Sequence, residues 1–109
     1  MDEKTKKKIS RTALRRHCKK LEDELKTILE NPPNDEEIKL KALKLNYSNQ
    51  IKKVKTVDEE IIALITTQEE LEEDLENNLM LDDIFYETLA KIDQRLENIV
   101  EKKPILLPS

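Results

Sequence analysis

The chain has one histidine and one cysteine, His17 and Cys18, and a cysteine nucleophile with an imidazole base would have to be built from them. Such a pair needs the imidazole within hydrogen-bonding reach of the thiol. Neighbouring residues of a helix project about 100° apart, so these two side chains would point in different directions. We therefore predict that Cys18 is a small packed side chain, that His17 is a polar neighbour, and that the chain has no catalytic residue.

Metal, cofactor and phosphate sites have equally little support in the sequence. Zinc sites use several Cys and His ligands, and this chain has one of each. The carboxylate run from Glu69 to Asp74 has the spacing of a solvated helix face. A glycine-rich phosphate loop is excluded because the chain contains no glycine. We predict a non-enzymatic protein with no metal, no cofactor and no small-molecule substrate.

Charge is distributed very unevenly along the chain. Residues 1–20 contain nine Lys or Arg against two acids, whereas residues 56–90 contain twelve acids and no Lys or Arg. In an up-down-up bundle these two segments would lie side by side and neutralise each other, and we favour that interpretation. The alternative is a surface for non-specific binding of RNA or of an anionic membrane, formed by residues 4–20. Its candidate residues are Lys4, Lys6, Lys7, Lys8, Arg11, Arg15, Arg16, Lys19 and Lys20.

The elements that must position these residues are helices. Charged residues make up 40% of the chain, Gly and Trp are absent, and the apolar residues recur at steps of three and four. We predict an all-α fold, a three-helix antiparallel coiled-coil bundle in a single domain over residues 1–103, followed by an extended tail or linker over 104–109. The predicted helices span residues 8–31, 35–65 and 67–102.

The sequence signal is stronger for the first predicted helix break than for the second. Pro32 and Pro33 end the first helix, and Asn34 or Asp35 can cap the second. At the second break, Thr67 and Glu70 have the spacing of a capping box, but no proline or glycine enforces a turn. The alternative is a long helical hairpin in which the second and third helices are continuous.

Helix periodicity also predicts the core and an outer apolar surface. In the third helix the predicted seam steps from Leu71 through Leu75 and Leu79 to Phe85. The predicted core consists of Leu14, Leu21, Leu25, Leu43, Tyr47, Val54, Ile61, Leu75, Phe85, Leu89 and Leu96. Five apolar residues fall on the opposite sides of the second and third helices and form a candidate self-association surface: Ile38, Ala42, Leu45, Met80 and Ile84.

Several short motifs resemble a known family. They are Arg11-x-x-Leu14-Arg15, the segment from Asp35 to Leu43, Asp58-Glu59-Glu60-Ile61, and Asp83-x-Phe85-Tyr86-x-x-Leu89-Ala90-Lys91. On these residues the chain resembles the helical N-terminal domain of gag-type polyproteins from Pao/BEL long-terminal-repeat retrotransposons. The tail Ile105-Leu106-Leu107-Pro108 resembles the start of the linker toward their capsid-like part. The resemblance implies a structural region that associates with itself or with other gag regions.

The leading functional hypothesis is therefore an assembly module that acts through helix–helix self-association as a homo-oligomer. One alternative is a module that binds RNA or anionic membrane through its basic end, and another is a heteromeric helical adaptor. The single cysteine and the polar start MDEKTKKK predict a cytoplasmic location. A nuclear location is the alternative, because the chain carries the basic clusters KKK and RRHCKK.

Overall fold

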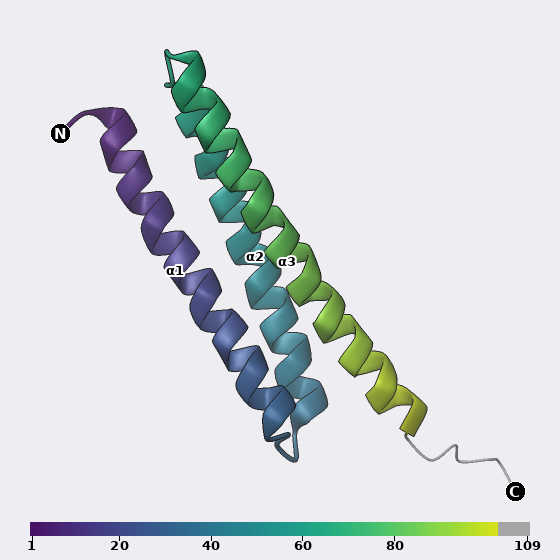
Figure 1. The fold of residues 1–109 in the computed structure, drawn as a ribbon. Coiled ribbons are helices and arrows are strands. Elements are labelled where there is room, and N and C mark those ends of the chain that lie inside the picture. Colours follow the sequence, from purple (N-terminus) through teal and green to yellow (C-terminus); the bar gives the residue numbers. More distant parts are fainter. Residues whose placement is uncertain (103–109) are drawn as a thin grey trace, which may run out of the picture.

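The computed structural model describes residues 1–102, which form three α-helices joined by two short turns (Figure 1). Helix α1 spans Glu3–Glu30, α2 spans Glu36–Ile62 and α3 spans Gln68–Lys102. Helices α1 and α3 run in the same direction and α2 runs antiparallel to both, which confirms the all-α, up-down-up bundle. The tail predicted over 104–109 lies outside the described residues.

Helix α1 begins five residues before the predicted start at residue 8. Asp2 caps it, because its side chain accepts a hydrogen bond of 2.7 Å from the backbone N–H of Thr5. The sequence prediction missed this first turn because it relied on apolar periodicity, and residues 3–8 contain no apolar side chain. With 28 residues in α1 against 35 in α3, the mismatch in length is about 10 Å.

The connection between α1 and α2 contains Pro32 and Pro33, as predicted. Pro32 and Pro33 lack the backbone donor that a continuing helix needs, so α1 ends at Glu30. Asp35 precedes the first residue of α2, but its side chain makes no capping hydrogen bond. The backbone N–H of Glu36 instead donates to the carbonyl of Pro33 at 3.2 Å.

The break between α2 and α3 is real, so the continuous helical hairpin is wrong. Helix α2 ends at Ile62, three residues earlier than predicted, and the chain turns over residues 63–67. Thr67 caps the N-terminus of α3, because its Oγ1 accepts a hydrogen bond of 3.3 Å from the backbone N–H of Glu70. The predicted capping spacing therefore identified the turn that no proline or glycine marks.

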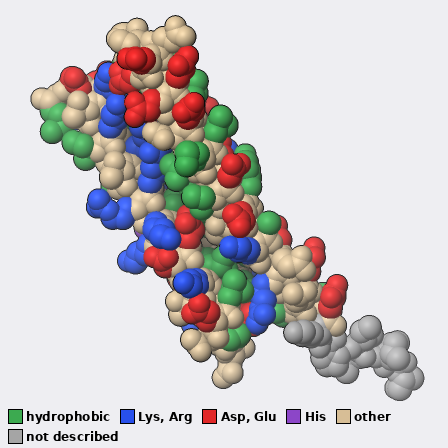
Figure 2. Space-filling view, in the orientation of Figure 1, with side chains coloured by type: hydrophobic (Ala, Val, Ile, Leu, Met, Phe, Trp, Pro, Cys, Tyr) green, Lys and Arg blue, Asp and Glu red, His purple; other side chains and the backbone are tan. Residues whose placement is uncertain are grey.

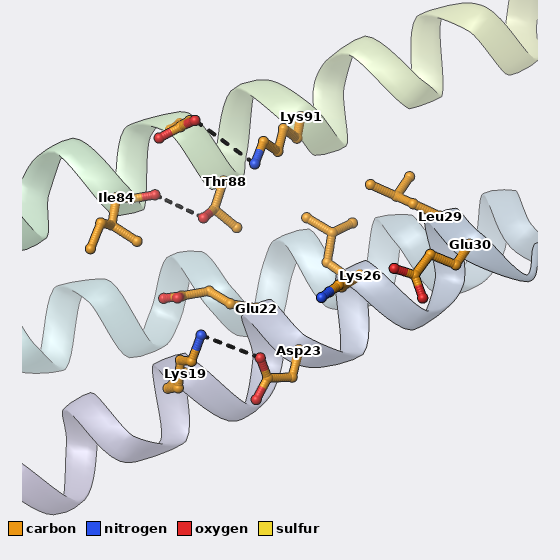
Figure 3. Close-up of a pocket in the computed structure, with 11 residues that line it drawn as sticks. Lys19, Glu22, Asp23, Lys26, Leu29, Glu30, Ile84, Thr88 and Lys91 are labelled. Atoms are coloured by element: carbon orange, nitrogen blue, oxygen red, sulfur yellow. Dashed lines mark hydrogen bonds and ion pairs between the residues drawn. The ribbon is translucent and has the colours of Figure 1, made fainter.

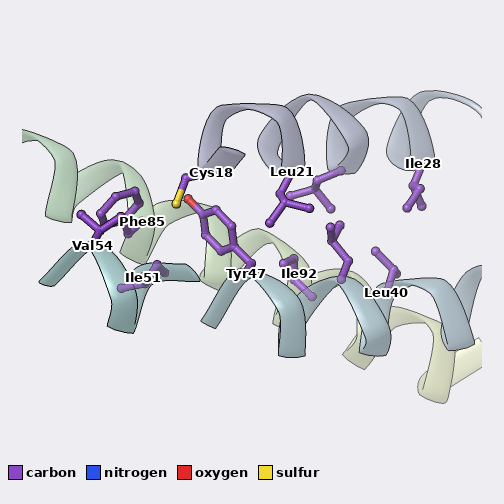
Figure 4. Packing of buried hydrophobic residues seen from close by; sticks show 11 residues of the cluster. Cys18, Leu21, Ile28, Leu40, Tyr47, Ile51, Val54, Phe85 and Ile92 are labelled. Carbon is purple, nitrogen blue, oxygen red and sulfur yellow. The ribbon is translucent and has the colours of Figure 1, made fainter. Parts of the chain in front are cut away.

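A continuous apolar core fills the space between the helices (Figure 4). Tyr47 lies at its centre and is fully buried, with its ring edge-on to Phe85 at a centroid distance of 6.0 Å. The Tyr47 hydroxyl donates to Glu22 Oε2 at 2.9 Å, so its polar end is satisfied. Ten of the predicted core residues lie in or against the core: Leu14, Leu21, Leu25, Leu43, Tyr47, Val54, Ile61, Phe85, Leu89 and Leu96.

The predicted seam at the start of α3 is wrong. Leu75 and Leu79 are exposed, at 42% and 64%, although both were placed on the inner side of the helix. Steps of four residues rotate a stripe by about 40° each time, so Leu71, Leu75 and Leu79 drift away from the core. The buried face of α3 is instead formed by Asp74, Asn78, Leu81, Phe85, Thr88 and Ile92, of which Asn78 and Leu81 are partly buried.

Candidate interaction surfaces

The N-terminal turns of α1 are held to the rest of the bundle by ion pairs. Lys4 and Lys8 both contact the carboxylate of Glu70, each at 2.9 Å, and Lys7 contacts Glu60 at 2.5 Å. The partners come from the start of α3 and the end of α2, which lie beside the start of α1 (Figure 1). The predicted self-neutralisation therefore occurs, and these lysines lie along the bundle.

A buried charge cluster continues this contact further into the bundle. Arg11 donates through Nη1 to Asp58 at 3.1 Å and through Nη1 and Nη2 to Asp74 at 3.0 and 2.7 Å. Arg15 donates through Nη2 to Asn78 at 2.8 Å and lies 3.5 Å from Asp58. The side chains of Arg11 and Asp74 are only 9% and 7% exposed. Buried charges of this kind are stable only when paired and hydrogen-bonded, so all three helices are fixed in register here.

The two aspartates of the cluster differ in their titration. The hydrogen bond from Arg11 lowers the pKa of Asp74 below its ordinary value. Burial raises the pKa of Asp58 by more than its contacts with the arginines lower it. Burial likewise lowers the pKa of Arg15, whose Nε is buried without a hydrogen-bond partner among the described residues. The contact of Arg11 with Asp74 is bidentate and includes the shortest hydrogen bond of the cluster, at 2.7 Å.

This arrangement divides the candidate RNA or lipid residues into two groups. Five of them turn toward acidic or amide partners on α2 and α3: Lys4, Lys7, Lys8, Arg11 and Arg15. The other four, Lys6, Arg16, Lys19 and Lys20, are exposed, and Lys19 pairs with Asp23 one turn along α1 at 3.4 Å. The exposed positive surface is therefore smaller than the sequence indicates.

The candidate self-association residues are all exposed but do not form one surface. Ile38, Ala42 and Leu45 share the outer side of α2, opposite its buried residues. Met80 and Ile84 belong to α3, and Ile84 lies on the side of α3 that faces α1. The structure thus separates the predicted surface into one patch on α2 and another on α3.

Helix α3 carries the larger of the two patches. Leu75 and Ile84 lie on opposite flanks of α3, each 42% exposed, and Leu79 and Met80 lie between them at 64% and 68%. Together these four residues flank the side of α3 that points away from the core, with Leu75 and Leu79 on one flank and Met80 and Ile84 on the other, and we call them the α3 apolar face. Sequence periodicity predicts a core position for Leu75 and a seam position for Leu79, so it identifies only Met80 and Ile84 as outer residues.

A groove also runs between α1 and α3, with a volume of about 450 Å³ (Figure 3). Leu25, Leu29 and Ile84 contribute its apolar lining. Four of its charged side chains pair within their own helices, with Lys19 on Asp23 at 3.4 Å and Lys91 on Glu87 at 3.8 Å.

His17 and Cys18 behave as the sequence predicted for packing. Cys18 is buried in the core, where it lies beside Tyr47 (Figure 4), and His17 is half-buried at its edge. Burial raises the pKa of the Cys18 thiol to about 11, so the thiolate is scarce at neutral pH.

Residues 1–102 lack two further features. No group of three or more His, Cys, Asp or Glu side chains is arranged to hold a metal ion. None of the helices in this range combines the length and the apolar character that crossing a membrane requires.

Comparison of the chain with models of known protein families, with curated proteins and with solved structures finds no match. The resemblance to gag-type polyproteins therefore stays a prediction from the motifs quoted above.

Proposed function

We propose that the chain is a non-enzymatic assembly module that self-associates through the α3 apolar face. The observation that carries this proposal is the exposure of Leu75, Leu79, Met80 and Ile84 within ten residues of one helix. Isolated exposed apolar residues are normal, but here they form two pairs at i, i+4 spacing, Leu75 with Leu79 and Met80 with Ile84, and such groups are typical of a protein–protein contact. A helix that offers such a face can pack on a helical surface of another chain.

The charges of α1 support protein association over RNA or membrane binding. Non-specific RNA binding depends on the number of phosphates that Lys and Arg neutralise. Five of the nine candidate basic residues already contact partners in the same chain. An RNA or a membrane would have to compete with those contacts, whereas the α3 apolar face has no partner among the described residues.

A retroelement origin is the finer form of this proposal. In that form the chain is the N-terminal structural region of a gag-like polyprotein, acting in the cytoplasm or nucleus on itself or on other gag regions. The motif Asp83-x-Phe85-Tyr86 supports it by residue resemblance. The test is the parent gene: a capsid-like region and a protease encoded downstream are expected. An unrelated downstream sequence would instead indicate a heteromeric adaptor.

Sedimentation velocity of matched variants tests the self-association itself. Leu79→Ser with Met80→Ser removes the most exposed part of the α3 apolar face, and Ile38→Ser with Leu45→Ser is the control on the outer side of α2. We expect the α3 variant to sediment as a monomer at concentrations where the wild type and the α2 control form larger species. Equal sedimentation of the wild type and the α3 variant would contradict the proposal.

A further inference from the structure

The exposed charges of the bundle are sorted by helix. Residues 4–21 of α1 and residues 38–57 of α2 contain no acid, while residues 68–90 of α3 contain no Lys or Arg. Contacts place these segments at the same level of the bundle, since Arg11 reaches both Asp58 of α2 and Asp74 of α3. At that level one side of the molecule is basic and the other is acidic. Figure 2 shows part of this sorting, with Lys and Arg side chains along α1 and acidic side chains over α3.

The basic side contains a groove between α1 and α2. Its volume is about 360 Å³, and it is lined by Leu14, Lys52, Lys53, Thr56 and Val57. Leu14 and Val57 are only half-buried, so an apolar floor remains accessible. Lys52 and Lys53 are exposed and make no ion pair with the described residues. We call this site the α1–α2 basic groove.

The acidic side is the middle of the outer side of α3, between the two apolar pairs of the α3 apolar face. Glu72, Glu76 and Asp83 are exposed and project from the same outer side of α3 as Leu79 and Met80. None of the three acids makes an ion pair with a described residue. An occupant of this face must therefore offer apolar surface together with positive charge.

We propose that the occupant is a second copy of this chain, whose α1–α2 basic groove receives the α3 apolar face of the first. This inference rests on the proposed self-association and names the two surfaces that meet. Leu79 and Met80 would lie over Leu14 and Val57, while Glu72, Glu76 and Asp83 would meet Lys52 and Lys53. Contact between two α3 faces is disfavoured because it would bring the unpaired acids of both chains together.

The positions of the two surfaces determine the kind of assembly. In a three-helix bundle the groove between two helices lies opposite the third, so the α1–α2 basic groove and the α3 apolar face point in opposite directions. Each chain then uses one surface on one neighbour and the other surface on the next. Such a heterologous contact leaves one free surface of each kind at the two ends, and chains continue to add.

Two variants with neutralised surfaces test this pairing. The face variant carries Glu72→Gln, Glu76→Gln and Asp83→Asn, and the groove variant carries Lys52→Gln and Lys53→Gln. All five residues are exposed, and unchanged circular dichroism would confirm that both variants fold. The matched control is Glu97→Gln with Glu101→Gln, which removes two exposed acids of α3 outside the base-free segment.

We expect each surface variant alone to associate up to about tenfold more weakly than the wild type, because several interfacial charge pairs are lost at once. The control should associate like the wild type. A mixture of the two surface variants should form complexes of two chains at wild-type affinity and larger species about tenfold more weakly. Each such pair has one intact groove against one intact face, and the remaining surfaces are weakened.

Mass photometry or light scattering of the mixtures separates the outcomes. Wild-type association that is unaffected by either variant and by salt would overturn the charge-directed pairing while the proposed function stands. A wild type whose mass stops at a closed dimer would also overturn it. A wild type that stays monomeric would overturn the proposed function and this inference together.

Discussion

Replacement of Arg11 by methionine is the most informative single perturbation of the fold. The substitution keeps an unbranched side chain of similar length but removes the guanidinium that contacts Asp58 and Asp74. Asp74 would then be buried without a cation at hydrogen-bonding distance. Asp58 would keep only its longer contact of 3.5 Å with Arg15.

The expected loss follows from burial and from the number of contacts. Removing one member of a buried ion pair costs about 3–5 kcal/mol, because the remaining charge is left uncompensated. The Arg11 and Asp74 side chains are 9% and 7% exposed and share two hydrogen bonds, so the full range applies. Domains of this size are stable by about 5–15 kcal/mol, so the Arg11→Met variant should be close to unfolding.

A double-mutant cycle turns this magnitude into a test of the pairing. Adding Asp74→Leu to Arg11→Met removes the second charge of this pair, and the double variant should lose less than the sum of the two single losses by about 0.5–3 kcal/mol. A residual loss is expected because Asp58 stays buried without Arg11. Urea unfolding followed by circular dichroism gives the four free energies of unfolding. Lys19→Met, which breaks an exposed pair with Asp23, is the control and should cause no measurable loss. A double variant whose loss equals the sum of the single losses would refute the coupling.

Other predictions concern the thiol, the core and acid stability. Cys18 should react with a thiol reagent at pH 8 only at the rate of unfolding, because it is buried and its pKa is raised to about 11; fast modification of the folded chain would contradict this. Leu21→Ala should cost about 2–5 kcal/mol, whereas Leu75→Ala should cost under about 0.5 kcal/mol, as thermal or urea unfolding can measure. The stability that ionised Asp74 gives the folded state is present above its ordinary pKa of 3.8 and is lost as the pH falls through its lowered folded pKa. The pKa of Asp58 is raised in the folded state, so protonation of Asp58 favours the folded state. The acid loss measured by unfolding at stepped pH should therefore be shallower in Asp74→Asn and steeper in Asp58→Asn than in the wild type, and equal slopes would contradict the assignment.

Helix number and the main turns could be predicted because they depend on local chemistry. Pro32 and Pro33 remove backbone donors, and Thr67 offers a side-chain acceptor three residues before Glu70. Both breaks can therefore be predicted from residues at the break itself. The pairing of the basic start of the chain with the acids of α3 was also predictable, because the topology brings those segments together.

The inner face of α3 could not be recognised from apolar residues alone. Its first two inward positions, Asp74 and Asn78, are polar, and they are buried because Arg11 and Arg15 of α1 meet them there. A hydrophobic pattern therefore follows Leu75 instead, which points outward. The available signal was the alternating spacing of four and three that runs backward from Ile92 to Asp74, through Thr88, Phe85, Leu81 and Asn78.

The error at α3 has a direct functional consequence. Leu75 and Leu79, predicted on the inner seam, are exposed and flank the outer side of α3 together with Met80 and Ile84. Sequence periodicity therefore identifies Met80 and Ile84 of the proposed self-association surface but predicts an inward position for Leu75 and Leu79. Their shared outward position became evident only from the buried charges on the opposite side of the same helix.

Self-association is tested most directly by the absolute mass of the wild-type chain, measured by light scattering over a concentration series at low and high salt. We expect the weight-average mass to rise above the monomer value of 12.8 kDa with concentration, without reaching a plateau, and to rise less at high salt. A mass that stays at the monomer value at every concentration and both salt levels would contradict self-association through α3.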